Sequence, residues 1–380
     1  MSDKKIIILI PCLNEGKVIG DVIRDSWIGL NNDKINNQVL IIDSGTDDSE
    51  EIAKSLGADV LKTPKRGLGR AYIDSIPHIK GDYVVMGDAD GTYDFKETPN
   101  FTKKLDEGYE YVMGTRMKGW IEDGAMPKLH RYFGTPLTTW ILNKLFKLNF
   151  SDIHCGMRAM TKDTLIKIDL RSKSWEYASE MVIKAGLLKL KTAEVPIHFY
   201  KDKNGRISHH KRAGWFSPWY AGWINLKIMF LYAPNFIFFI PGVLAFTIGL
   251  ATTFISISGL VYHLQYHFAF LGLALTSIGY LTIQLGIISK SFSDLNKYYK
   301  DKIVSYFEKN FNYNKGMAAS FIIILLGTIL SSYFFAQWWK SQFKLQSMSI
   351  YGVSGLTLII LGFQTMYFTF IYELFRISKE

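Results

Sequence analysis

The sequence predicts an α/β domain with a mostly parallel, Rossmann-like sheet, followed by an all-α membrane domain of four transmembrane helices. Two observations carry this prediction. In residues 1–212, short apolar runs alternate with segments of helical spacing, which is the rhythm of β–α–β units. In residues 235–380, four long apolar stretches carry no charged side chain. Between the two, residues 213–234 are expected to form an amphipathic segment at the membrane interface.

Five strands are expected in the first domain, each an apolar run before a polar turn: Lys5–Ile10, Gln38–Ile42, Asp59–Lys62, Asp82–Met86 and Tyr109–Met113. Ligands of parallel sheets bind at the carboxyl ends of the strands. Polar side chains gather at those expected ends: Asn14 and Glu15 after the first strand, Asp43 after the second, Asp88 and Asp90 after the fourth, and Arg116 after the fifth. The sequence therefore predicts a binding site along this edge of the sheet.

The membrane spans are expected at about 235–260, 268–289, 316–339 and 352–372, since about 20 apolar residues cross a bilayer. Orientation follows from the loops, because lysine and arginine mark the cytoplasmic side. The loop from Lys290 to Lys315 carries six lysines, whereas the loop at Tyr262–His267 carries no lysine or arginine. We therefore expect a multi-pass protein of the cell membrane, with the first domain and both termini in the cytoplasm.

Two stretches have the composition of interfacial helices. Met126–Leu148 mixes basic side chains with Leu, Phe and Trp, and Trp215, Trp219 and Trp223 recur every four residues. Each could instead be an ordinary core stripe of the first domain. Pro218 is expected to interrupt the second stretch, because proline lacks the backbone N–H that a helix interior uses.

The turn Gly87–Asp90 places two carboxylates, Asp88 and Asp90, one residue apart after a strand. Such a pair can hold Mg²⁺ or Mn²⁺, because Mg²⁺ takes few protein ligands and completes its shell with phosphates and water. A metal there would neutralise a leaving diphosphate. Asp94, four residues further on, is either a third ligand or a helix cap.

A longer series of motifs carries a family resemblance. LIPCLNE, IIDSGTDDS, RGLGRAY and GDYVVMGDADGTYDF occur in that order, followed by MGTRMKG, GAMPKLHRYFGTP, SDIHCGMRAM, YASEMVIKA, AEVPI and NGRISHHKRAGW. From about Lys5 to Pro241 the chain resembles the family 2 glycosyltransferases of GT-A fold. Within them it is similar to the polyprenyl-phosphate glycosyltransferases, the group of the dolichol-phosphate mannose and glucose synthases. The membrane half is similar in layout only.

The resemblance implies inverting transfer of one sugar from a nucleotide diphosphate sugar, UDP- or GDP-linked, to a dolichyl or undecaprenyl phosphate at the cytoplasmic face. It assigns Asp90 to the metal and to catalysis, and Arg116 and Arg131 to catalysis and to the acceptor phosphate. Nucleotide-sugar binding falls to Pro11, Asn14, Glu15, Asp43, Gly69, Arg70, Asp88 and Ala89. The glycines Gly67 and Gly69 have a plain turn as an equal alternative.

The chemistry agrees with these residue types. The nucleophile is a phosphate oxygen, which is already anionic at neutral pH, so no strong general base is needed. The enzyme must bring two anionic reactants into line, and the planar fork of arginine suits a lipid phosphate. A bilayer-anchored acceptor also accounts for membrane helices on an otherwise soluble domain.

Some residues depart from the family pattern or have two interpretations. Thr92 stands where many relatives have Gln or Asn. The basic loop Gly205–His209 contains Arg206, which is either a third candidate for binding the acceptor phosphate or part of a solvated charge run.

Cys12 and Cys155 are expected to be packing residues. His154 beside Asp152 is expected to be structural. Glu176 and Glu180 either contact sugar hydroxyls or pair with Arg158, and at least one is expected to pair with Arg158.

Other functions fit less well. A processive polysaccharide synthase is the main alternative, although the chain has no Gln-x-x-Arg-Trp motif. A non-catalytic scaffold predicts loss of the aspartates or arginines, and a transporter predicts charged residues in the spans. The net charge of +10 is spread over both halves without a basic tail, which argues against nucleic acid as a partner. The sugar, the base, the lipid and any homo-oligomer stay open.

Overall fold

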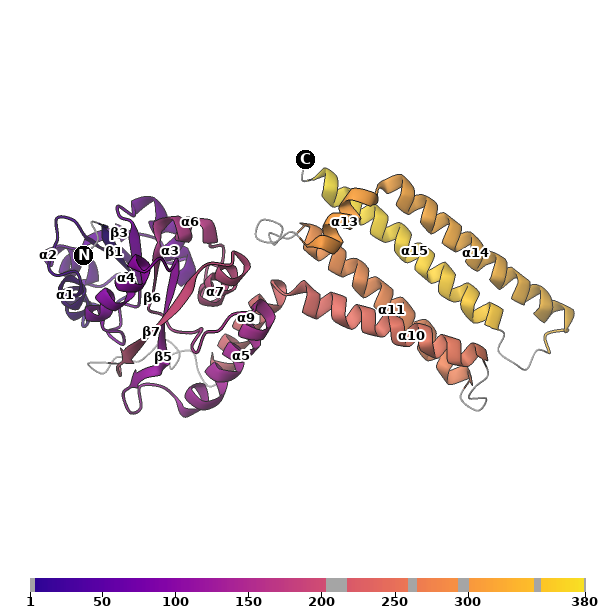
Figure 1. The fold of residues 1–380 in the computed structure, drawn as a ribbon, viewed down its shortest axis with the longest axis horizontal. Helices are drawn as coiled ribbons and strands as arrows, with labels where there is room; N and C mark the ends of the chain where they lie inside the picture. Colours follow the sequence, from indigo (N-terminus) through magenta and orange to yellow (C-terminus); the bar gives the residue numbers. More distant parts are fainter. Residues whose placement is uncertain (1–3, 203–216, 259–264, 293–300, 345–349, 379–380) are drawn as a thin grey trace. The chain divides into compact units, whose positions relative to one another are not determined.

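The computed structural model describes residues 4–202, 217–258, 265–292, 301–344 and 350–378. The chain divides into two compact units, Met1–Tyr232 and Ala233–Glu380, and each is described by itself (Figure 1). Arg206 and Trp215 lie outside the described residues, so the roles predicted for them remain predictions.

The first unit is built on a seven-stranded sheet with the order β3-β2-β1-β4-β6-β5-β7. Four strand pairs are parallel, and β6 is antiparallel to both β4 and β5, which confirms the prediction of a mostly parallel sheet. The strands are β1 Ile6–Cys12, β2 Gln38–Asp43, β3 Asp59–Lys62, β4 Tyr83–Met86, β5 Tyr111–Ile121, β6 Arg158–Thr161 and β7 Thr192–Phe199.

The core of this unit lies along β1, β2 and β4. Every residue of β2 and β4 is buried, and Ile7–Ile10 are at most 1% exposed. Such continuous burial is typical of central strands in a sheet that is covered on both faces. The helices of this unit are α1 Ile19–Gly29, α2 Ser49–Ser55, α3 Leu68–Ser75, α4 Thr98–Asp106, α5 Thr135–Phe146, α6 Lys162–Ile168, α7 Tyr177–Leu187 and α9 Ser217–Leu231, with short turns η1 Ile76–His78, η2 Phe95–Glu97 and the π-helical η3 His130–Gly134.

Two sequence predictions need correction in this unit. The fifth strand runs on to Ile121, because β7 continues to pair with it past an irregularity between Thr115 and Trp120. Arg116 therefore lies inside β5 and does not follow it. Pro218 does not break the helix that follows it, because the structure describes α9 as helical over Ser217–Leu231, which includes Pro218.

The basic and aromatic stretch Met126–Leu148 forms η3 and α5. Tyr132, Phe133 and Trp140 are exposed, whereas Leu142 and Phe146 are buried against the unit. This stretch therefore has a buried apolar face, as a core stripe would, and an exposed aromatic face, as an interfacial helix would. In α9, Trp223 is also exposed.

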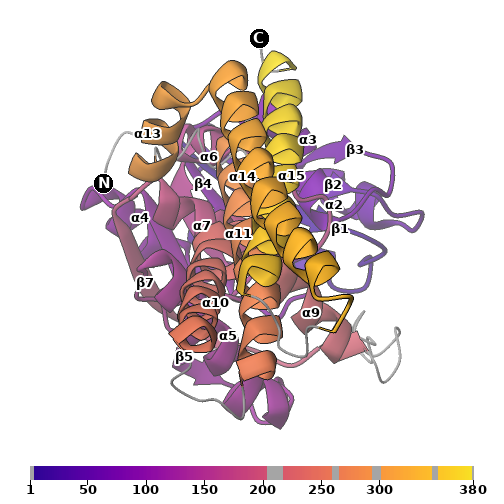
Figure 2. The ribbon, with the colours of Figure 1, turned by 90° about the vertical axis from the view of Figure 1, so that its right-hand side faces the viewer.

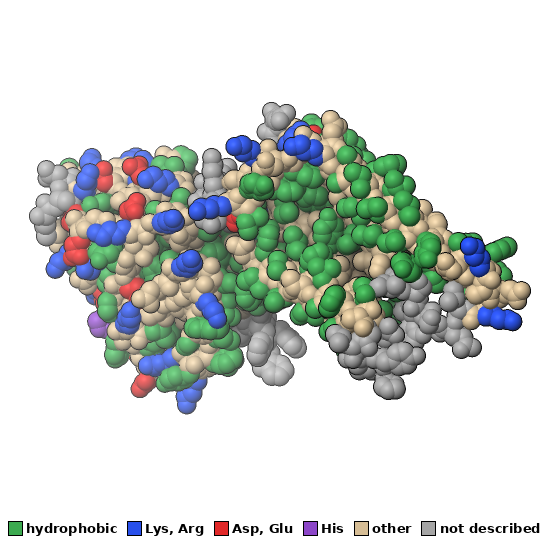
Figure 3. Space-filling view, turned by 45° about the vertical axis from the view of Figure 1, so that its right-hand side comes forward, with side chains coloured by type: hydrophobic (Ala, Val, Ile, Leu, Met, Phe, Trp, Pro, Cys, Tyr) green, Lys and Arg blue, Asp and Glu red, His purple; other side chains and the backbone are tan. Residues whose placement is uncertain are grey.

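The second unit is helical, and it confirms the prediction of four long apolar helices. They are long and apolar enough to cross a membrane over Asn235–Ser258, His267–Phe292, Tyr313–Lys340 and Tyr351–Ile377. The elements are η4 Asn235–Phe239, α10 Ile240–Ser258, α11 Gln265–Phe292, α13 Lys302–Asn310, α14 Tyr313–Lys340 and α15 Ile350–Ile377. Hydrophobic side chains cover most of the visible surface of this unit, as lipid contact would require (Figure 3).

These helices pack in pairs, α10 with α11 and α14 with α15, and Figure 2 shows the second pair side by side. Small residues allow the close approach. A Cβ on Gly249 of α10 would lie 2.4 Å from the Thr276 nitrogen of α11, and one on Gly327 of α14 would lie 2.8 Å from the Gly355 oxygen of α15. Glycine at such crossings is a common device of membrane helix pairs.

Candidate active site

The loops after β1 and β2 form one end of the candidate site. Cys12 and Asp43 are register partners at the carboxyl ends of these parallel strands, and Pro11 pairs with Ile42 just before them. Asn14 has a left-handed φ of 59°, and its Oδ1 accepts a hydrogen bond of 2.8 Å from the Thr46 backbone N–H. The Glu15 N–H donates to Ser49 Oγ at 3.1 Å. The structure thus brings the predicted residues Pro11, Asn14, Glu15 and Asp43 together at one edge of the sheet.

The Asp43 side chain is completely buried, and each of its carboxylate oxygens accepts one hydrogen bond. Its Oδ1 accepts the Gly45 N–H at 2.8 Å, and its Oδ2 accepts the Lys62 ammonium at 2.6 Å. Gly45 must stay glycine here, because a Cβ would lie 2.7 Å from Asn14 Oδ1. Lys62, at the end of β3, was not singled out by the sequence analysis, because a single lysine after a short strand gives no local signal.

The Asp-x-Asp turn follows β4, as predicted. Gly87 packs against the ring of Phe95, so closely that a Cβ would lie 2.6 Å from the Phe95 Cζ. Asp90 Oδ1 accepts both the backbone N–H and the hydroxyl of Thr92, at 3.0 Å and 2.6 Å. Ala89 between the two aspartates is buried. Thr92 therefore orients Asp90 instead of adding an amide ligand.

Asp94 acts as a helix cap in this structure. Its side chain accepts the Lys96 N–H at 3.0 Å at the start of η2, and Lys96 Nζ lies 3.7 Å from its other oxygen. Among the described residues, no group of three or more His, Cys, Asp or Glu side chains is placed to hold a metal ion. Asp88 and Asp90 alone still fit Mg²⁺ by donor chemistry, since Mg²⁺ needs only one or two protein carboxylates beside substrate phosphates.

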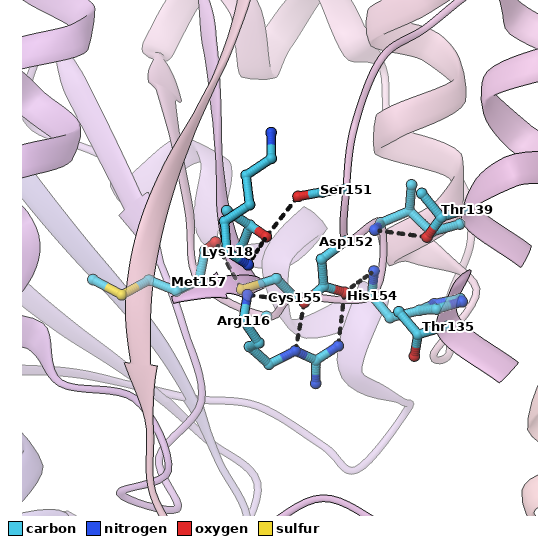
Figure 4. Close-up of polar contacts among 12 residues, drawn as sticks. Arg116, Lys118, Thr135, Thr139, Ser151, Asp152, His154, Cys155 and Met157 are labelled. Carbon is cyan, nitrogen blue, oxygen red and sulfur yellow. Dashed lines mark hydrogen bonds and ion pairs between the residues drawn. The ribbon is translucent and has the colours of Figure 1, made fainter. Parts of the chain in front are cut away.

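Arg116 in β5 is held by Asp152 through a buried bidentate ion pair. Nε donates to Oδ2 at 2.7 Å and Nη2 to Oδ1 at 2.9 Å, and the Arg116 backbone N–H also donates to Oδ2, at 3.1 Å (Figure 4). The third guanidinium nitrogen points away from Asp152 in this view. The ring of Phe199 lies 5.2 Å from the Arg116 Cζ. One edge of the fork is thus used by Asp152, and the Nη1–Nη2 edge is left for another anion.

Burial and pairing act in opposite directions on this pair. Burial alone would lower the pKa of Arg116 and raise the pKa of Asp152. The mutual attraction outweighs burial, so the pKa of Arg116 is raised and that of Asp152 is lowered. Both side chains therefore stay charged.

Tyr93 connects the Asp-x-Asp turn with the Arg116 region. Its hydroxyl accepts the Gly156 N–H at 2.7 Å, and a Cβ on Gly156 would lie 2.6 Å from Asp88 Oδ2. Burial raises the pKa of Tyr93 well above its ordinary value, and the nearby charges of Arg116 and Asp88 also act on it. The two predicted halves of the site therefore meet around Tyr93 and Gly156, neither of which the sequence analysis had proposed.

Arg131 lies in η3 and is half-buried. Its Cζ lies 5.6 Å from the ring of Tyr132, and no carboxylate of the described residues forms an ion pair with it. The neighbouring His130 is close enough to influence the titration of His154, which in turn senses Arg116. The charge of Arg131 is thus not offset by a carboxylate among the described residues, and its contact with an acceptor phosphate stays a prediction.

His154 has a structural role, as expected. Its backbone N–H donates to Asp152 Oδ1 at 3.2 Å, while its ring Nε2 pairs with the Thr138 hydroxyl of α5 at 2.8 Å. Burial lowers the pKa of His154 to about 4. A histidine that is neutral at physiological pH, and whose ring does not contact Asp152, is not built as an acid–base dyad.

Burial also raises the pKa of Cys12 and Cys155 to about 12, so both stay protonated packing residues.

The expected pairing of Glu176 or Glu180 with Arg158 is wrong. Glu180 forms an ion pair with Lys184 and accepts the Ser172 N–H at 2.7 Å, and Glu176 accepts the Ser174 N–H at 3.4 Å. Arg158 is fully buried and donates instead to the Tyr111 hydroxyl and to the carbonyl oxygens of Ala178 and Cys155.

The RGLGRAY loop is explained by packing. A Cβ on Gly67 or Gly69 would lie 2.2 Å from a backbone oxygen of Lys173 or Ser172. Arg70 forms an ion pair of 2.7 Å with Asp74, one turn further along α3. The close backbone approach accounts for both glycines, so contact of Gly69 and Arg70 with a nucleotide stays a prediction.

Comparisons with known proteins agree with this architecture. The family model for Glycosyl transferase family 2 matches residues 7–169, and that for the Glycosyltransferase family 2 C-terminal transmembrane region matches residues 287–376. The low-salt glycan biosynthesis hexosyltransferase Agl6 of Haloferax volcanii is 30% identical over 368 residues, covering 96% of this chain and 87% of Agl6. This chain belongs to glycosyltransferase family 2, and it is a glycosyltransferase with a GT-A domain and a helical C-terminal region.

Two further similarities each cover part of this chain. A dolichyl-phosphate hexose transferase of Haloferax volcanii is 28% identical over 204 residues, covering 53% of this chain and 85% of that protein. A crystal structure of glucosyl-3-phosphoglycerate synthase from Mycobacterium tuberculosis with Mn²⁺, UDP-glucose and phosphoglyceric acid has a TM-score of 0.46 and 20% identity, over 60% of this chain and 80% of that one.

Proposed function

We propose that this enzyme transfers a hexosyl unit from a nucleotide diphosphate sugar to a polyprenyl phosphate, with inversion, at the cytoplasmic face of the membrane. The observation that carries the proposal is the anchored Arg116, whose free Nη1–Nη2 edge lies in the same neighbourhood as the Asp-x-Asp turn. An enzyme that joins two anions needs one group for each. The name of the dolichyl-phosphate relative and four apolar helices in the same chain support a lipid acceptor.

Each end of the site has a role in this proposal. Pro11, Asn14, Glu15 and Asp43 hold the nucleotide. Asp88 and Asp90 would hold Mg²⁺ or Mn²⁺, which when bound neutralises charge on the departing diphosphate. Arg116 and Arg131 hold the acceptor phosphate, whose oxygen attacks the anomeric carbon from the face opposite the diphosphate. No described side chain is needed to remove a proton, because that oxygen is already anionic.

The direct test is transfer to lipid. The full-length enzyme in nanodiscs is given a panel of labelled UDP- and GDP-hexoses with polyprenyl phosphate and Mn²⁺, and the lipid is extracted. We expect label in a single glycolipid, with polyprenol lacking phosphate as the inactive control. NMR of the product should show an inverted anomeric centre. Label in a polymer that grows with time would identify a processive synthase and overturn the proposal.

The cytoplasmic orientation is part of the proposal and has its own test. Asn310 lies at the end of α13, within the lysine-rich connection between α11 and α14, and Gln265 begins α11 at the opposite end. In intact cells, a cysteine at Asn310 should resist membrane-impermeant thiol reagents, whereas a cysteine at Gln265 should react. The reverse labelling pattern would place the nucleotide site outside the cytoplasm.

A further inference from the structure

The segment 152–157 contacts both halves of the candidate site. At its start, Asp152 holds Arg116 through the bidentate ion pair (Figure 4). Near its end, Gly156 lies against the Asp-x-Asp turn so closely that a Cβ would come within 2.6 Å of Asp88 Oδ2. Asp152 and Gly156 are both buried. One short piece of chain therefore links the arginine proposed for the acceptor phosphate to the turn proposed for the metal.

Tyr93, in the chain just after the Asp-x-Asp turn, holds this segment in place. Its hydroxyl accepts the Gly156 backbone N–H at 2.7 Å, in a buried hydrogen bond. Its ring also occupies the space beside Gly156, because a Cβ there would lie 2.9 Å from Tyr93 Cε2. Gly156 is thus fixed by one short hydrogen bond and by close contact with both Tyr93 and Asp88.

The end of β7 in turn fixes the position of Tyr93. Tyr93 pairs with Phe199 in an antiparallel bridge, and their ring centroids are 5.3 Å apart. The Tyr200 backbone N–H donates to the Thr92 carbonyl oxygen at 2.9 Å. The Phe199 ring also lies 5.2 Å from the Arg116 Cζ. Tyr93, which is 6% exposed, therefore has a second connection to Arg116, through Phe199.

The distance between the two halves of the site matters for the proposed reaction. A phosphate held by Arg116 must reach the anomeric carbon of a sugar whose diphosphate is held at the Asp-x-Asp turn. Misplacing reactants by about 1 Å can lower a rate by about 100-fold, even when each reactant still binds. A residue that fixes Arg116 relative to the turn can therefore control the rate without touching a substrate.

We infer that Tyr93 is a positioning residue, whose hydroxyl fixes Arg116 relative to the Asp-x-Asp turn through the segment 152–157. The inference rests on the proposed function, which assigns Arg116 to the acceptor phosphate and the turn to the donor diphosphate. Tyr93 is buried and acts through Gly156 and Phe199. Its loss should impair the alignment of the two bound substrates and leave the binding of each one alone unchanged.

Tyr93→Phe tests this inference in the full-length protein in nanodiscs. The substitution keeps the ring and leaves the buried Gly156 N–H without its partner. We expect kcat for hexosyl transfer to polyprenyl phosphate to fall about tenfold or more, because the reactants are less well aligned. The acceptor KM should stay close to wild type. Calorimetry with UDP and with GDP, each at fixed Mn²⁺, should also show wild-type affinity.

Tyr83→Phe is the matched control. Tyr83 is 8% exposed, and its hydroxyl donates to Asp106 Oδ1 at 3.0 Å. It begins β4, at the end of the strand opposite to the Asp-x-Asp turn. Chemical denaturation should show a loss of stability for both variants, whereas kcat should fall only in Tyr93→Phe.

Gly156→Ala perturbs the same contact from the other side. Its Cβ would press on Asp88 Oδ2 and on the Tyr93 ring. We therefore expect this variant to lose affinity for the nucleotide diphosphate in Mn²⁺ as well as kcat. Wild-type affinity and kcat in a folded Gly156→Ala would overturn the link between this segment and the turn.

The outcomes separate the inference from the function on which it rests. A folded Tyr93→Phe with wild-type kcat overturns the positioning role. A loss confined to nucleotide affinity or to the acceptor KM, with unchanged kcat, also overturns it, because Tyr93 would then support a binding site and not the alignment. Absence of transfer to polyprenyl phosphate by the wild type contradicts the proposed function itself.

Discussion

Two aspartates of the candidate site, Asp43 and Asp90, are oriented by backbone amides of the turns that they open, whereas Arg116 is held by a side chain that is distant in the sequence. Asp43 and Asp90 each accept an N–H from two residues ahead, at Gly45 and Thr92. Arg116 depends on Asp152, which lies 36 residues away in the sequence. The two turn contacts follow from local chain conformation, whereas the contact of Arg116 depends on tertiary structure.

The comparison also separates the two arginines. Arg116 is buried and oriented by a carboxylate that offsets its charge, whereas Arg131 is half-buried and has no carboxylate partner among the described residues. The guanidinium of Arg116 is thus already oriented before a ligand binds, whereas the charge of Arg131 is not offset by a carboxylate among the described residues. The predictions below test each side of this contrast.

The largest effect is expected from Asp90→Ala, in the Asp-x-Asp turn after β4. If Asp90 holds the metal at the diphosphate, its loss should lower kcat by more than about 100-fold, because charge on the leaving group is left uncompensated. Thr92→Val is the control, since it removes only one of the two hydrogen bonds that Thr92 donates to Asp90 and should retain most activity. EDTA should mimic Asp90→Ala, with recovery on adding Mg²⁺ or Mn²⁺. Full activity in excess chelator contradicts the metal assignment.

Beside Arg116, the substitution Asp152→Ala should mainly affect the stability of the fold. Removing one partner of a buried ion pair costs about 3–5 kcal/mol of unfolding free energy, because Arg116 keeps an uncompensated buried charge. Lys118→Ala is the control in the same strand, since its pair with Glu194 is exposed on the lysine side and should contribute less than about 1 kcal/mol. Chemical denaturation in detergent measures both.

This contribution of Asp152 has a defined pH dependence. Folding lowers the pKa of Asp152, so its stabilisation is present above the unfolded pKa near about 4 and is lost as the pH falls below it. Asp152→Asn keeps the shape without the charge, and it should raise the acceptor KM while leaving nucleotide affinity unchanged. An Asp152→Asn enzyme with wild-type KM for the lipid would mean that the pair supports only the fold.

Arg131→Ala should have a smaller and more selective effect. Losing one charged hydrogen-bonding partner costs about 1.5–3 kcal/mol, which is about ten- to a hundredfold in use of polyprenyl phosphate. Nucleotide-sugar binding, measured by calorimetry without acceptor, should barely change. Arg131→Lys should restore part of the activity, since an ammonium lacks the two-pronged contact. Loss of nucleotide affinity with an unchanged acceptor KM would instead place Arg131 on the donor side.

The contrast between local and distant support also explains which features were predictable. The strands β1 to β4, the turns after them and the four apolar helices follow from periodicity and turn residues that lie close together in the sequence. The extension of β5 past Thr115 depends on pairing with β7, and the partners of Arg116, Glu180 and Arg158 depend on tertiary contacts. Local patterns carry no record of such contacts, which is why Lys62, Tyr93 and the anchoring role of Asp152 emerged only from the structure.

The smallest expected effect is the contribution of His154 to the pH dependence of stability. It can be distinguished from the contribution of the neighbouring Arg116–Asp152 ion pair. Burial lowers its pKa from 6.5 to about 4, so between these values the unfolded chain binds a proton that the folded chain does not. Stability should therefore fall as the pH drops through this window, by about 1 kcal/mol between pH 7.5 and 5.5. His154→Gln removes the titrating ring and should flatten this part of the stability curve, whereas replacement of the exposed His78 by Gln should leave it unchanged. Because folding lowers the pKa of Asp152 from its ordinary value, its effect on stability lies at lower pH than that of His154. A curve that keeps its slope in His154→Gln would show that another group responds to pH there.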